Sequence, residues 1–192
     1  MSLRTVASSG VGDHPTAAAR GGTLPEPELV LVADYDPTWP HQFDALRVPL
    51  AGVLGDIAIS IEHVGSTAVP GLAAKSIIDL DVVIASREEL PAAIKALAEL
   101  GYVHEGDLGI PGREAFRWPA DEPRHHLYVC AVGNEPLQQH LAFRDYLRAH
   151  QDVAAEYARL KRRLAREHGD DREAYTRGQS EFIERVLRRA VA

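Results

Sequence analysis

The hydrophobic and polar positions of the chain follow strand-like patterns over its first two thirds and helix-like patterns over its last third. Short apolar runs bounded by Gly, Pro, Asn or Asp are typical of strands. They occur at residues 29–32, 58–64, 77–85, 102–105, 114–118 and 125–132. Apolar residues at spacings of three and four predict helices from about Pro40 to Val53, then up to Leu100, and over most of the chain after Pro136. Pro49 is expected to kink or end the first of these helices.

These elements predict an α+β fold. We expect a mixed β-sheet with residues 77–85 as its central strand, flanked by helices, with the helices after Pro136 packed on the same core. Residues 1–27 are rich in Ser, Ala, Gly and Thr and show no apolar periodicity, so they are expected to form a disordered tail. Residues 28–192 are then expected to form a single domain.

Composition narrows the class of protein. The chain has 192 residues, a single cysteine (Cys130) and a formal net charge of −7. One cysteine excludes an intrachain disulfide framework and favours a reducing, cytoplasmic setting. The acidic balance makes nucleic acid an unlikely partner, and no apolar stretch is long enough to span a membrane. The charge is uneven, because residues 144–192 carry 12 Lys/Arg against 9 Asp/Glu, whereas residues 1–143 carry 9 against 19.

The residues that suggest chemistry lie between His63 and Ile84. Side chains alternate along a strand, so Asp79 and Asp81 are expected on one face, with Leu80 on the other. Two carboxylates held in this way form a site for a hard divalent cation such as Mg²⁺ or Mn²⁺. The alternative is a polar strand face that meets solvent.

The loop before this strand favours the functional interpretation. Gly65 permits close approach of a ligand to the backbone, and the hydroxyl groups of Ser66 and Thr67 add polar contacts. Lys75 lies between the loop and the carboxylates and is expected to reach a phosphate group. A Gly-Ser turn followed by an Asp-x-Asp strand therefore predicts a phosphate-bearing small-molecule ligand.

This combination resembles the nucleotidyltransferase superfamily with its polymerase-β-like fold. More narrowly, the chain is identified as a member of the GrpB family over about residues 29–187. The resemblance rests on Tyr35-Asp36-Pro37, Trp39-Pro40, the stretch IEHVGSTAVPGLAAKSIIDLDVVI, FRDYLR from Phe143, YARLK from Tyr157, and the Tyr175-Thr176 and Phe182-Ile183 pairs.

The resemblance implies a nucleotidyltransferase-like fold and a site for a nucleoside triphosphate with metal ions. It also implies an alternative, because some GrpB domains are fused to dephospho-coenzyme A kinases, where a folding-accessory role has been proposed. The chain departs from the pattern of active transferases in lacking a third carboxylate on the strand of residues 125–132. It also has Tyr128 where relatives often have His, and Gln179 where they commonly have Lys.

Two functions follow from the sequence. The first is metal-dependent transfer of a nucleotidyl or phosphoryl group, with Asp79 and Asp81 as metal ligands and His63, His126 or Glu62 as candidate bases. The second is a non-catalytic nucleotide- or anion-binding module. Arg113 and Arg117 are candidate anion ligands from the later strands, with solvated edge charges as the alternative.

Overall fold

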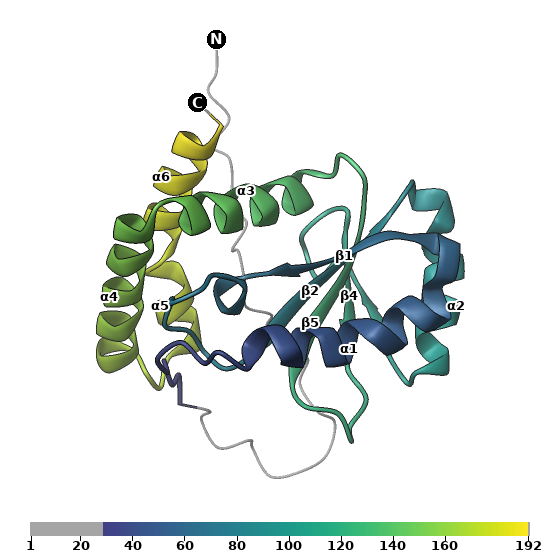
Figure 1. Ribbon diagram of the computed structural model, residues 1–192, viewed down its shortest axis with the longest axis horizontal. Coiled ribbons are helices and arrows are strands. Elements are labelled where there is room, and N and C mark those ends of the chain that lie inside the picture. The colour runs from purple at the N-terminus through teal and green to yellow at the C-terminus, as the bar shows by residue number, and fades with distance from the viewer. Residues whose placement is uncertain (1–28, 192) are drawn as a thin grey trace.

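The computed structural model describes residues 29–191, so the expected disorder of residues 1–27 lies outside the described part of the chain. Five strands form one mixed sheet in the order β1-β2-β5-β4-β3 (Figure 1). Their bounds are β1 Ala58–Val64, β2 Ile78–Ile84, β3 Val103–Gly106, β4 Arg113–Arg117 and β5 His125–Ala131. Strands β2 and β5 pair in parallel, and the other neighbouring strands pair antiparallel. The expected α+β class with a mixed sheet is confirmed.

Helices cover both sides of this sheet. Their bounds are α1 Trp39–Leu54, α2 Leu90–Glu99, α3 Glu135–Ala149, α4 Gln151–Glu167, α5 Arg172–Arg177 and α6 Ser180–Ala190. Figure 1 shows α1 and α3 on opposite sides of the strands, with α4, α5 and α6 gathered beyond one end.

Strand β2 separates two environments because its side chains alternate. Leu80, Val82 and Ile84 are buried in the main apolar core, together with residues of α1 and α2. Asp79 and Asp81 point to the opposite face, where α3 crosses the sheet. The alternation predicted from the sequence is therefore confirmed.

The C-terminal helices form a second apolar cluster that continues into the loop after β1. Phe143 and Leu147 of α3 pack with residues of α4 and α6 and with Val69 and Leu72 of the loop. The Gly-Ser loop is thus held between the sheet and the helical layer.

Three details of the sequence prediction are wrong. Residues 29–32 form no strand, because Val30 packs against Leu164 and Tyr175, and only a single bridge pairs Ala33 with Ala74. Helix α1 continues through Pro49, since the buried Leu50 and Leu54 anchor its last turns and offset the lost backbone hydrogen bond. The middle strand is β5, and β2 lies one place from the edge.

Candidate functional site

The loop after β1 brings the backbone close to a carboxylate. Gly65 has φ 72° and ψ −170°, a conformation essentially restricted to glycine. A Cβ atom at this position would lie 2.1 Å from Oδ2 of Asp79. The turn Ser66–Ala68 follows, and Nε of Arg148 donates to its Ala68 carbonyl over 2.9 Å. Glycine is therefore required here both by its dihedral angles and by the close approach of Asp79.

Asp79 lies at the inner end of this loop and pairs with His126. The two residues are register partners in the parallel ladder between β2 and β5, so their side chains share a face. Nδ1 of His126 donates to Oδ1 of Asp79 over 2.7 Å, and the Asp79 side chain is 18% exposed. The expectation that His126 stands beside the carboxylates is confirmed.

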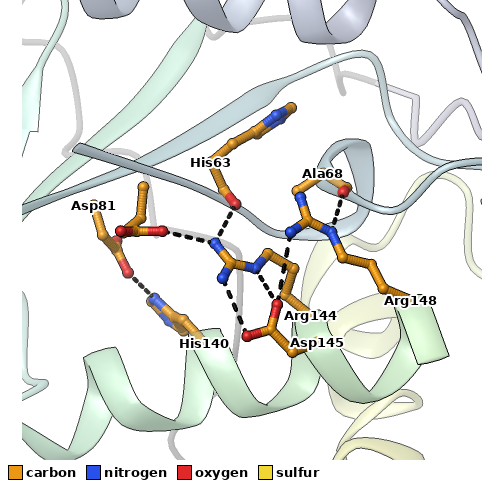
Figure 2. Close-up of polar contacts among 8 residues, drawn as sticks. His63, Ala68, Asp81, His140, Arg144, Asp145 and Arg148 are labelled. Carbon is orange, nitrogen blue, oxygen red and sulfur yellow. Dashed lines mark hydrogen bonds and ion pairs between the residues drawn. The ribbon is translucent and has the colours of Figure 1, made fainter. Parts of the chain in front are cut away.

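Asp81 is completely buried and pairs with a histidine from a different element. Nδ1 of His140, on α3, donates to Oδ2 of Asp81 over 2.6 Å, as Figure 2 shows. Burial lowers the pKa of His140, but the charge and the hydrogen bond of Asp81 raise it, and the balance is a raised pKa. Each carboxylate of the Asp-x-Asp motif therefore accepts a hydrogen bond from an imidazole.

Arg144 and Arg148 join α3 to the sheet and its loop. Arg144 donates from Nη1 to Glu62 over 2.9 Å and to the His63 carbonyl over 3.1 Å, and its Nε bonds to Asp145 (Figure 2). These bonds fix the helix that carries His140. The FRDYLR stretch thus has a structural role in positioning the pocket.

His63 lies on the other face of the sheet from Asp79 and Asp81, so the expectation that it stands beside them is wrong. In the antiparallel ladder His63 is the register partner of Leu80, and its ring stacks on Phe43 of α1 at 4.6 Å. Nε2 lies 3.0 Å from Oγ1 of Thr67. Burial lowers the pKa of His63 to about 4, which keeps the ring neutral near neutral pH.

A pocket opens at the loop, between the sheet and the helical layer. It is lined by Val64, Gly65, Ser66, Thr67, Lys75, Ile77, Asp79, His126, Tyr128, His140, Phe143, Tyr157, Lys161, Tyr175 and Gln179. The pocket brings together several residues that the sequence indicated, namely those of the Gly65–Thr67 loop, Lys75, Asp79 and His126. Asp81 is not part of the wall.

Lys161 is a pocket residue that the sequence reasoning missed. It is 2% exposed, its Nζ donates to Oγ of Ser66 over 2.7 Å, and it lies 4.4 Å from the ring centroid of Tyr157. Burial, followed by the positive charge of Lys75, lowers the pKa of Lys161 well below its ordinary value. The feature of the sequence that could have identified it is the helical spacing, which places Lys161 on the same apolar face as Val153 and Tyr157.

Other predicted ligands have different positions. Nζ of Lys75 lies 5.4 Å from the ring centroid of Tyr175, on the pocket wall. Arg113 is buried against the ring of Tyr128, and Arg117 lies 3.6 Å from Glu105. The structure therefore does not bring Arg113 and Arg117 to the pocket.

The arrangement does not fit a Mg²⁺ ion shared by the two carboxylates. Asp81 is buried away from the pocket wall, and one oxygen of each aspartate already accepts a hydrogen bond from an imidazole. Among residues 29–191 there is no group of three His, Cys, Asp or Glu side chains placed to hold a metal ion. Asp79 is the carboxylate of the pair that remains accessible from the pocket.

Comparison with known proteins defines the family. The GrpB protein family model matches residues 29–189. The UPF0157 protein YqkA of Bacillus subtilis is 39% identical over 156 residues, which cover 81% of this chain and 45% of YqkA. The crystal structure of GrpB from Enterococcus faecalis is similar with a TM-score of 0.76 and 33% identity, over 84% of this chain and 97% of that one. The chain belongs to the GrpB family.

More distant matches concern the fold and a fused context. The Cid1 poly(U) polymerase with MgGTP bound has a TM-score of 0.51 at 14% identity, over 70% of this chain and 44% of that one, which shows a shared fold alone. A dephospho-CoA kinase of Mycolicibacterium paratuberculosis is 28% identical over 181 residues, covering 81% of this chain and 44% of the kinase. The chain spans less than half the length of YqkA and of this kinase. Within residues 29–191, no helix has both the length and the apolar composition needed to cross a membrane.

Proposed function

We propose that the pocket binds the phosphate groups of a nucleoside triphosphate or a related phosphate-bearing small molecule, directly through cations of the chain. The observation that carries the proposal is the meeting of Lys161 and Ser66 at 2.7 Å beneath the Gly65 loop, with Lys75 on the same wall. Two amines and a hydroxyl group are donors that recognise a phosphate.

The electrostatics of Lys161 support this assignment. A buried amine beside a second lysine is disfavoured in its charged form, which is why its pKa is lowered. An anionic ligand in the pocket would favour the charged form. Binding is therefore expected to raise the pKa of Lys161, so the affinity of the parent protein should fall as the pH rises, which calorimetry at several pH values measures.

The test is titration calorimetry with inorganic pyrophosphate and with nucleoside triphosphates. Lys161→Met is expected to weaken binding about 10- to 100-fold, because a hydrogen bond to a charged group contributes about 1.5–3 kcal/mol. Lys95→Met removes an exposed lysine of α2 and is the matched control. Equal affinities in Lys161→Met and in the parent protein would refute the proposal.

A second candidate is transfer of a nucleotidyl or phosphoryl group to an acceptor. The nucleotidyltransferase-like fold and the Asp79–His126 pair on the pocket wall favour it. The metal dependence expected from the sequence belongs to this candidate, with Asp79 as its accessible carboxylate. Nucleotidyl transfer releases pyrophosphate from a nucleoside triphosphate, and phosphoryl transfer releases the nucleoside diphosphate. An assay for both products, with and without Mg²⁺ or Mn²⁺, separates this candidate from binding alone.

The non-catalytic alternative has support of its own. The match to a dephospho-CoA kinase favours a binding or folding-accessory module linked to coenzyme A biosynthesis. Tight binding of triphosphate with release of neither pyrophosphate nor nucleoside diphosphate, over a panel of hydroxyl-bearing acceptors, is the result expected from such a module.

A further inference from the structure

Asp81 is fully buried and makes one side-chain hydrogen bond within the described part of the chain. Its residue exposure is 0%, and Oδ2 accepts from Nδ1 of His140. Its other oxygen, Oδ1, is buried and has no hydrogen-bond partner among residues 29–191. Burying the charge of a carboxylate is costly unless a polar partner compensates for it. His140 is that partner, so we expect the effect of Asp81 to be on His140.

His140 connects this buried charge to the pocket. It lies on α3, which Arg144 fixes to β1, and its ring forms part of the pocket wall. Since Nδ1 is committed to Asp81, the ring's polar contact with a ligand must come from Nε2. A carboxylate that bonds one imidazole nitrogen fixes the orientation of the ring and keeps a proton on that nitrogen. Nε2 donates as well when the ring carries both protons, and the buried negative charge of Asp81 favours that form.

We infer that His140 is a ligand-binding residue whose Nε2 donates a hydrogen bond to a phosphate oxygen in the pocket, and that Asp81 is the residue that positions it. This inference rests on the proposed function, because it takes the ligand to be a phosphate. It gives the inner aspartate of the motif a role other than metal binding.

The charges around His140 agree with this role. Asp81 contacts it directly, and Asp79 acts in the same direction at longer range, while Arg113 acts in the opposite direction. Burial lowers the pKa of His140, but the charge and the hydrogen bond of Asp81 raise it, and the balance is a raised pKa. When both ring nitrogens carry protons, His140 adds a third donor to those of Lys75 and Lys161 on the pocket wall.

The first experiment uses the parent protein labelled with ¹⁵N-histidine and observed by NMR. Without ligand, the Nδ1 proton of His140 is expected far downfield because of its short bond to Asp81, and this signal should be lost in Asp81→Asn. As inorganic pyrophosphate is added, the Nε2 resonance of His140 should shift progressively and reach a plateau when the pocket is saturated. Absence of the downfield signal in the parent would overturn the positioning role of Asp81.

Matched variants give the second readout, by calorimetry with pyrophosphate. His140→Gln is expected to weaken binding about 10- to 100-fold, and Asp81→Asn about 10-fold. His104→Gln is the control, because His104 forms a similar pair with Glu114, at 2.8 Å, outside the pocket wall. Its affinity for pyrophosphate should equal that of the parent.

The outcomes separate this inference from the proposed function. If pyrophosphate binds the parent and Lys161→Met weakens it, while the Nε2 resonance does not move and His140→Gln binds normally, only the inference about His140 fails. If the parent does not bind pyrophosphate or triphosphates, the proposed function fails and the inference fails with it.

Discussion

Two histidines, one on each side of the sheet, have pKa values that are shifted in opposite directions. On the face toward α1, His63 stacks on Phe43 and burial lowers its pKa to about 4. On the face toward α3, His140 is buried as well, but the carboxylate of Asp81 raises its pKa. The difference shows that burial alone does not decide the charge of a side chain. A paired carboxylate can reverse the direction in which burial shifts the pKa of an imidazole.

The largest expected effect comes from breaking the buried pair on the α3 face. Asp81→Ala leaves Nδ1 of His140 buried without its hydrogen-bond acceptor and should lower the free energy of unfolding by about 3 kcal/mol. Asp79→Ala should cost about 1 kcal/mol, because Asp79 is partly exposed to the pocket. Urea unfolding of the two variants measures the difference. Equal costs would show that the two aspartates are equivalent.

The close approach of the loop to Asp79 is tested by Gly65→Ala. The backbone conformation alone should cost about 1–3 kcal/mol, and the new Cβ would also displace the Asp79 carboxylate. Gly71→Ala is the control, since Gly71 also has a positive φ but a Cβ atom there would meet no other atom within 4 Å. Pyrophosphate binding should fall in Gly65→Ala but not in Gly71→Ala. Equal affinities of the two variants for pyrophosphate would show that the Gly65 loop does not contribute to binding.

The α1 face is tested by the pH dependence of stability. Because the pKa of His63 is about 4 in the folded state and about 6.5 in the unfolded state, its contribution is fully present above pH 6.5. The contribution is lost as the pH falls from 6.5 to about 4, with a slope of at most about 1.4 kcal/mol per pH unit. Unfolding measured across this range should show a shallower slope for His63→Gln than for the parent.

His41→Gln, an exposed histidine of α1, is the control for this measurement and should keep the parent slope. Identical slopes for the parent and His63→Gln would show that His63 is not held neutral by its surroundings.

The two faces also differ in how far the sequence predicts them. Alternation along β2 is sufficient to place Leu80 in the core and both aspartates opposite it, because strand geometry is local. The pairing of Asp81 with His140 and the reach of Lys161 to Ser66 span 59 and 95 residues of sequence. Such contacts depend on how α3 and α4 pack, which local patterns do not contain.

The errors have the same origin. Nearness in sequence to the Gly-Ser loop predicts His63 beside the carboxylates, although the antiparallel register with Leu80 turns it to the other face. Residues 29–32 have the apolar run of a strand but find helices rather than a sheet edge to pack on. In both cases tertiary context overrides a local pattern.

The central claim is that the chain's own cations bind phosphate, rather than an ion held by the Asp-x-Asp pair. The most direct measurement is the affinity of Asp79→Asn for pyrophosphate, with EDTA and again with Mg²⁺, beside Asp44→Asn as an exposed control on α1. Removing a negative charge from the pocket should strengthen binding about 3- to 10-fold in both conditions. Weaker binding by Asp79→Asn in Mg²⁺, with no loss in EDTA, would contradict the claim and show that Asp79 holds the metal.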